Sequence, residues 1–146
     1  MGKLEQVGEQ HGWRCWLCDE PVDRTIVNDP RGPSIDSVLT KAKSKKTGVT
    51  EERLAHRACN TKKGAVTPIV QWSDHLFLSD PAPILVSVDR LERKGGKEIM
   101  ARCPSLADAE EAAAWLIDRL SRLRPGWPVT TEIETGAGQF LVVLRA

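Results

Sequence analysis

The C-terminal part of the chain has the clearest alternation of apolar and polar positions. Apolar residues recur every three or four positions from 106 to 123, which predicts a helix with one buried face. Ser105 precedes this stretch as an N-cap residue, and Pro125-Gly126 ends it. The flanking segments predict four strands, over 84–91, 98–103, 129–133 and 140–144. Residues 94–96 predict a hairpin turn between the first two. The expected order is ββαββ, a small sheet with one helix packed on it.

The N-terminal part has more turn-forming residues and less periodicity. Leu4 and Val7 predict a short opening helix, alternation over 34–39 predicts a strand, and 60–64 predicts a helix that stops at a glycine. An irregular loop is expected over 28–33, where Asn, Asp, Gly and two Pro gather.

These patterns predict an α+β protein with two modules. The first covers 1–68, a connection covers 69–83, and the ββαββ domain covers 84–146. No apolar run approaches the roughly twenty residues that span a bilayer, and the first residues lack the apolar stretch of a signal peptide. We therefore expect a soluble, cytoplasmic protein with no membrane partner. Hydrophobic content of 40% and charged content of 28% are typical of a globular chain rather than a disordered one.

Two short cysteine motifs carry the strongest chemical signal. Cys15 and Cys18 form a C-x2-C pair, and His56 and Cys59 form an H-x2-C pair. Two such pairs complete a tetrahedral site, which suits structural zinc rather than catalytic zinc. A thioredoxin-like redox pair is the alternative for the first two, although that motif belongs to a βαβ unit. Cys103 stands alone, and we expect it to be a small buried residue in a strand.

Charge is distributed unevenly along the chain. The net charge is +1, but the window 41–63 carries +6 and the remainder −5. A window of this kind is either a solvated face or a surface for phosphate. Its basic residues are Lys41, Lys43, Lys45, Lys46, Arg53, Arg57, Lys62 and Lys63.

The WRCWLC stretch at 13–18, the SIDSV stretch at 34–38 and the HRACNTKKG stretch at 56–64 together resemble the HNH endonuclease family. The resemblance is to its subgroup with a zinc-stapled ββα-metal motif, and it covers about the first 65 residues. It implies that both cysteine motifs hold the structural zinc. It also implies that Asp36 and Asn60 hold a catalytic Mg²⁺ or Mn²⁺.

The chain departs from the family at the hydrolytic centre. The family's general base is a histidine directly after the aspartate, and Ser37 occupies that position. A serine hydroxyl cannot take a proton from water near neutral pH as imidazole does. Glu51 aligns with the asparagine that orients the histidine, and His75 after Asp74 is a remote candidate for a displaced base.

Three hypotheses follow. The first is an HNH-like zinc protein that binds nucleic acid, with DNA as the expected type, and has weak or lost phosphodiester cleavage. The second is an active metal-dependent endonuclease with another base. The third is a non-catalytic zinc module whose C-terminal domain binds a protein partner. The residues expected to contact nucleic acid are Lys43, Lys45, Lys46, Arg57, Lys62 and Lys63.

Overall fold

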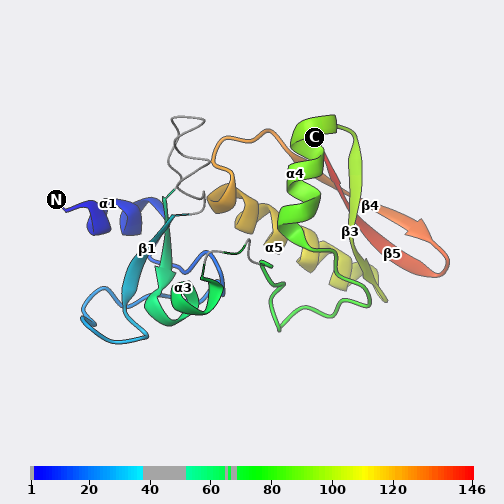
Figure 1. Cartoon of the computed structure of the whole chain (residues 1–146). Coiled ribbons are helices and arrows are strands. Elements are labelled where there is room, and N and C mark those ends of the chain that lie inside the picture. The colour runs from blue at the N-terminus through cyan, green and yellow to red at the C-terminus, as the bar shows by residue number, and fades with distance from the viewer. Residues whose placement is uncertain (1, 38–51, 65, 67–68) are drawn as a thin grey trace. The chain divides into compact units, whose positions relative to one another are not determined.

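The chain forms two compact units, Met1–Pro68 and Ile69–Ala146 (Figure 1). The structure is a computed structural model, and it describes residues 2–37, 52–64, 66 and 69–146. It is an α+β protein, and within those residues each unit contains one small antiparallel sheet. Within the described ranges, no helix is long and apolar enough to cross a membrane.

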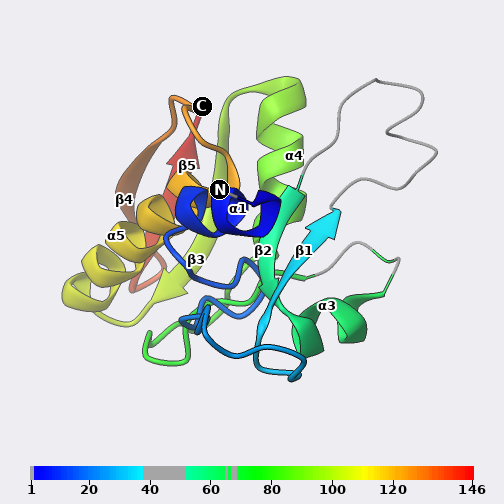
Figure 2. The same cartoon turned by 90° about the vertical axis from the view of Figure 1, so that its left-hand side faces the viewer.

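The first unit contains a two-stranded sheet followed directly by a helix (Figure 2). Strand β1 (Pro33–Ser37) pairs antiparallel with β2 (Glu52–His56), and Ile35 lies opposite Leu54. Helix α3 (Arg57–Lys63) begins at the residue after β2 and contacts both strands. The local order is therefore β-β-α. The strand predicted from residue 34 is confirmed as far as Ser37, the last described residue before the gap.

The opening helix is confirmed as α1 (Lys3–Gln10), with Val7 buried against the rest of the unit. The next residue of this helix must be a glycine, because a Cβ atom at Gly8 would lie 2.5 Å from the Trp13 ring. Helix α3 was predicted from residue 60 but begins three residues earlier. It ends at Gly64, whose φ of 63° is in the left-handed region that glycine tolerates best.

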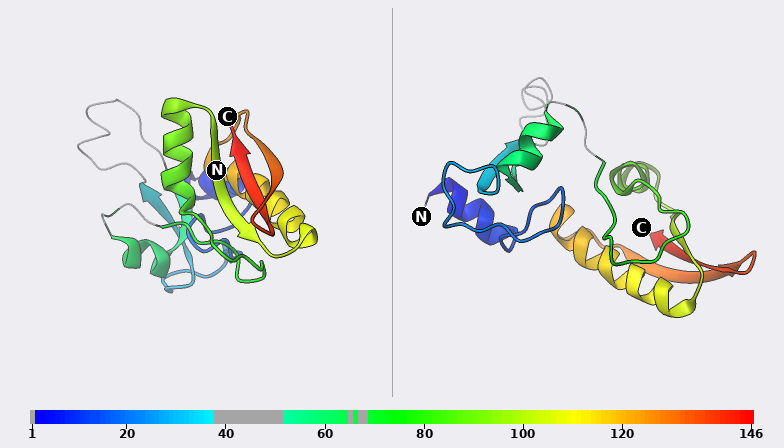
Figure 3. Two further views of the ribbon diagram at one scale, coloured as in Figure 1. Left: turned by 90° about the vertical axis from the view of Figure 1, so that its right-hand side faces the viewer. Right: turned by 90° about the horizontal axis from the view of Figure 1, so that it is seen from below.

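The second unit is a three-stranded sheet with helices packed on it (Figure 3). Its strands lie in the order β3-β5-β4, and all neighbours are antiparallel. Helix α5 contacts all three strands, so its buried leucines meet the inner face of the sheet. In chain order the elements are α4 (Ile84–Lys94), β3 (Lys97–Cys103), α5 (Leu106–Leu123), β4 (Thr130–Gly136) and β5 (Gln139–Arg145).

The predicted ββαββ order is wrong at its first element. The segment 84–91 is not a strand but the first two turns of helix α4, so the unit is αβαββ. Its buried residues Ile84, Val88 and Leu91 recur at steps of four and three, the spacing of one helix face. The β-branched residues favoured a strand, and burial of this face outweighed that preference. The predicted hairpin turn is the C-terminal end of α4, where Gly95 has a φ of 66°.

The remaining C-terminal predictions are confirmed. Helix α5 spans the predicted range, and the Ser105 side chain accepts a hydrogen bond from the backbone N–H of Asp108. Cys103 is buried at the end of β3. The other three predicted strands are present as β3, β4 and β5.

Residues 69–83, expected to connect two modules, form part of the second unit. The Ala82 N–H donates to the Met100 carbonyl oxygen of β3 over 2.7 Å. Trp72 stacks on Trp115 of α5 with ring centroids 5.2 Å apart. Its indole Nε1–H also donates to the Ala82 carbonyl oxygen over 2.9 Å. The segment is therefore tied to both the sheet and the helix.

Candidate metal centre

Four potential metal ligands converge in the first unit. The ligand atoms of Cys15, Cys18, His56 and Cys59 all lie within 4.8 Å of one another. His56 Nδ1 is 3.3 Å from Cys18 Sγ and 3.9 Å from Cys59 Sγ. Tetrahedral zinc holds sulfur at about 2.3 Å and nitrogen at about 2.0–2.1 Å, which sets its ligands roughly 3.5–3.8 Å apart. The cluster therefore has the dimensions of a zinc site.

A tight turn presents the first pair of ligands. The Cys15 N–H donates to the Glu20 carbonyl oxygen over 2.9 Å, and the Asp19 N–H donates to the Cys15 carbonyl oxygen over 2.9 Å. Asp19 adopts a φ of 66°, which closes the turn within a few residues. The N–H of Trp16 donates to the Leu54 carbonyl oxygen over 2.9 Å, so the turn is anchored to β2.

The second pair lies where β2 passes into α3. His56 ends the strand, and Cys59 lies in the first turn of the helix. The His56 backbone N–H donates to Cys15 Sγ over 3.4 Å, linking the two pairs. The ring Nε2 lies 3.0 Å from the Pro21 carbonyl oxygen. Because that oxygen can only accept, Nε2 carries the proton and Nδ1 is left to bind a metal.

The protonation of the three thiols is interdependent. A hydrogen bond from Cys18 lowers the pKa of the Cys15 thiol to about 4. The same interaction raises the pKa of Cys18, and burial raises the pKa of Cys59. The cluster therefore favours one thiolate stabilised by a neighbouring thiol. A divalent cation would replace the remaining protons and stabilise all three thiolates.

The donor set suits a structural metal. Three thiolates and one imidazole are a ligand combination of structural zinc, and four protein ligands leave no open position for substrate. The His56–Pro21 hydrogen bond supplies the outer contact that orients a zinc-bound imidazole. The residues thus fit zinc, whose contribution would be to hold the turn and the β2–α3 junction together.

Asp36 lies inside the unit with both carboxylate oxygens engaged. Its Oδ2 accepts a hydrogen bond from the Trp16 indole Nε1–H over 3.0 Å. Its Oδ1 lies 3.2 Å from Lys63 Nζ, and the Asp36 and Lys63 side chains are only 4% and 6% exposed. A divalent ion at Asp36 would have to displace the Lys63 ammonium. Binding of Mg²⁺ or Mn²⁺ here stays a prediction.

The other two residues of the expected hydrolytic centre differ in their surroundings. The Asn60 amide Nδ2 donates to Ser34 Oγ over 3.3 Å and to the Ile35 carbonyl oxygen over 3.4 Å, so it ties α3 to β1. Ser37 is exposed at the end of β1, opposite Glu52. Asp36 and Asn60 thus belong to one β1–α3 packing arrangement. Ser37, at the position of the family's base, presents a hydroxyl to solvent.

The basic residues of the 41–63 window fall into three groups. Arg57 and Lys62 are exposed on α3, whereas Lys63 is turned inward to Asp36. Arg53 is buried in β2. The other basic residues of the window lie outside the described residues, and so does Glu51. They are Lys41, Lys43, Lys45 and Lys46.

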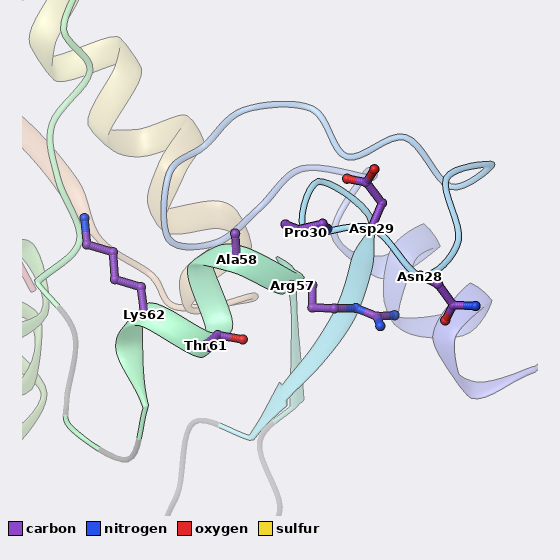
Figure 4. A pocket seen from close by; sticks show the side chains of 7 residues that line it. All are labelled: Asn28, Asp29, Pro30, Arg57, Ala58, Thr61 and Lys62. Carbon is purple, nitrogen blue, oxygen red and sulfur yellow. The ribbon is translucent and has the colours of Figure 1, made fainter.

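A hollow of about 420 Å³ lies between α3 and the loop before β1 (Figure 4). It was missed in the sequence, where 28–33 was interpreted only as an irregular loop. The sequence feature that could have predicted this wall is the loop's high content of turn-forming residues, because such residues fix the backbone conformation. Its walls are Asn28, Asp29 and Pro30 from the loop and Arg57, Ala58, Thr61 and Lys62 from α3.

Comparison of the chain with family models, curated proteins and solved structures gives no match. The relation to the HNH family therefore stays a resemblance carried by the quoted motifs.

Proposed function

We propose that the first unit is a zinc-containing, HNH endonuclease-like module that binds nucleic acid, DNA in the first instance, with weak or no cleavage of phosphodiester bonds. One helix, α3, carries the proposal. It contains the metal ligand Cys59, the exposed cations Arg57 and Lys62, and the buried cation Lys63. Exposed cations of this kind are what a phosphate backbone recognises.

The β-β-α order of β1, β2 and α3, with its four-ligand cluster, supports the resemblance to the HNH family. Weak cleavage is supported by two features. Ser37 offers no imidazole to activate water, and Lys63 already neutralises the carboxylate of Asp36. An active endonuclease is the alternative, and it would require both a different base and displacement of Lys63.

Binding is tested with labelled duplex DNA and duplex RNA in fluorescence anisotropy over a range of salt concentrations. Arg57→Gln and Lys62→Gln should each weaken DNA binding and reduce the salt slope by about one. Lys94→Gln, which changes an exposed lysine of α4, is the matched control and should change neither. Absence of DNA and RNA binding by the native, zinc-loaded protein would overturn the proposal.

Cleavage is tested on a supercoiled plasmid in Mg²⁺ and in Mn²⁺. The native protein should nick slowly or not at all, because a general base contributes about 10²–10⁴-fold. Ser37→His and Asp36→Ala are compared in the same assay. Robust cleavage by the native protein that Asp36→Ala abolishes would establish the active endonuclease instead.

A further inference from the structure

The hollow between α3 and residues 28–30 has the size and lining of a small-ligand site. Its volume of about 420 Å³ falls within the roughly 300–1,000 Å³ typical of such sites. Pro30 and Ala58 give it apolar walls, and the Thr61 hydroxyl and the Asn28 amide supply groups that can hydrogen-bond (Figure 4). Two of its lining residues, Arg57 and Ala58, lie between the candidate ligands His56 and Cys59 in the sequence.

The two walls are held together by backbone hydrogen bonds. The Ala58 N–H donates to the Pro30 carbonyl oxygen over 2.8 Å, and the Arg57 N–H donates to the Gly32 carbonyl oxygen over 2.9 Å. Gly32 cannot carry a side chain, because a Cβ atom there would lie 2.7 Å from the Ile26 carbonyl oxygen. Asn28 holds a left-handed φ of 58°. The hollow is therefore built by the fold.

The charges around the hollow favour an anionic ligand. Asp29 is the one carboxylate among the described residues that line the hollow, and Arg31 contacts both of its oxygens at 3.0 and 3.1 Å. Hydrogen bonds from Arg31 lower the pKa of Asp29 to about 2. Neither Arg57 nor Lys62 forms an ion pair with another residue of the described ranges. Two cations thus remain for a phosphate.

We infer that this hollow binds one unpaired nucleotide, with the base against Pro30 and Ala58 and the phosphate near Arg57, whose side chain extends along the loop wall (Figure 4). An unpaired base has an apolar face and a polar edge, which matches apolar walls with a few polar groups. The planar guanidinium of Arg57 can stack on a base as well as pair with phosphate. The inference deepens the proposed function, on which it rests, by naming a single-stranded or frayed end as the preferred substrate.

The test compares a short single-stranded DNA with a blunt duplex, using zinc-loaded protein. Native protein should bind the single strand more tightly, and a deoxynucleoside 5′-monophosphate should compete better than the nucleoside or inorganic phosphate. Ala58→Met fills the hollow while keeping a good helix former, and should weaken single-strand binding at least about tenfold, the lower end of the effect of a misfitting group in an apolar pocket. The control is Ala107→Met, because Ala107, like Ala58, is the exposed second residue of its helix.

Failure of the nucleotide pocket and failure of nucleic-acid binding by the first unit give different results. If Ala58→Met and Ala107→Met bind the single strand equally well, or if inorganic phosphate competes as well as the nucleotide, the pocket is overturned while binding by the unit stands. If native protein binds neither of these DNAs nor RNA, the proposed function fails as well. Thr61→Val, nearly identical in shape, should lower the affinity for the single strand but not for the duplex. Equal losses for both DNAs would show that the hollow does not select an unpaired base.

Discussion

The two units of the chain hold themselves together by different means. Among the described residues, six apolar side chains are buried in the first unit and eighteen in the second. The second unit packs α5 along a three-stranded sheet, so its core is continuous. The first has a two-stranded sheet, which on its own is only marginally stable in water. What it has instead is a cluster of four potential metal ligands and a buried ion pair.

The difference in core size bears on which unit can expose functional groups. A continuous hydrophobic core is lined by apolar side chains, so few polar groups of such a unit face inward. A metal can hold a short, polar segment together with few apolar contacts. The remaining surface of α3 then stays open for cations and for the hollow. Variants that perturb one unit at a time should therefore affect stability in one unit and leave the other unchanged.

The largest effect should come from removing the metal. Structural zinc in small modules contributes about 10–16 kcal/mol of apparent binding free energy at neutral pH. A chelator, or Cys59→Ala, should therefore unfold the first unit and leave the second folded. NMR spectra that resolve both units, with zinc content measured in parallel, check this.

Cys103→Ala is the matched control, because Cys103 is buried in the second unit. It should leave the zinc content at one ion per chain and affect only the resonances of the second unit. Two outcomes would contradict the prediction that folding of the first unit depends on a metal. One is a purified, reduced protein without zinc, and the other is a first unit that stays folded after chelation.

The next effect concerns the Asp36–Lys63 pair. Lys63→Met leaves a buried carboxylate without its cation, which typically costs about 3–5 kcal/mol. Denaturant unfolding of the first unit should show that loss. Lys62→Met changes the exposed neighbour and should stay within about 0.5 kcal/mol of native.

Manganese provides a second measurement on the same variant. If Lys63 occupies a cation position beside Asp36, Mn²⁺ should stabilise Lys63→Met more than the native protein, because only a ligand that binds the folded state raises its stability. Equal stabilisation of both proteins would show that removing Lys63 does not open a cation site.

The smallest effect is expected at the start of α5. Ser105→Ala removes the hydroxyl that accepts from the Asp108 N–H over 3.1 Å, and loss of such a cap costs about 0.5–2 kcal/mol. The loss should appear in thermal unfolding of the second unit, with the zinc content and the first unit unchanged. A fall in the stability of the first unit would show that the two units do not unfold independently.

Local patterns explain which elements could be predicted. Helix α5 has an N-cap, an apolar stripe and a Pro-Gly end, three signals that agree. Segment 84–91 has β-branched residues that favour a strand and buried positions that fit a helix, so its signals conflict. No alternation of apolar and polar residues predicted β2, whose residues Leu54 and Ala55 are buried. The strand is covered by β1, α1, α3 and the Cys15 turn, which come from other parts of the chain.

The sequence alone indicated the chemistry of a candidate metal site, because ligand types and a two-residue spacing within each pair are local properties. It also showed that the position after Asp36 holds a hydroxyl and not an imidazole. The meeting of the two pairs within 4.8 Å depends on the fold. Only the tertiary structure decided what surrounds these residues. The pairing of Asp36 with Lys63, and the meeting of residues 28–30 with Arg57 and Ala58, join parts of the chain that are distant in sequence. Such contacts depend on packing and burial of the whole unit, which no short pattern encodes.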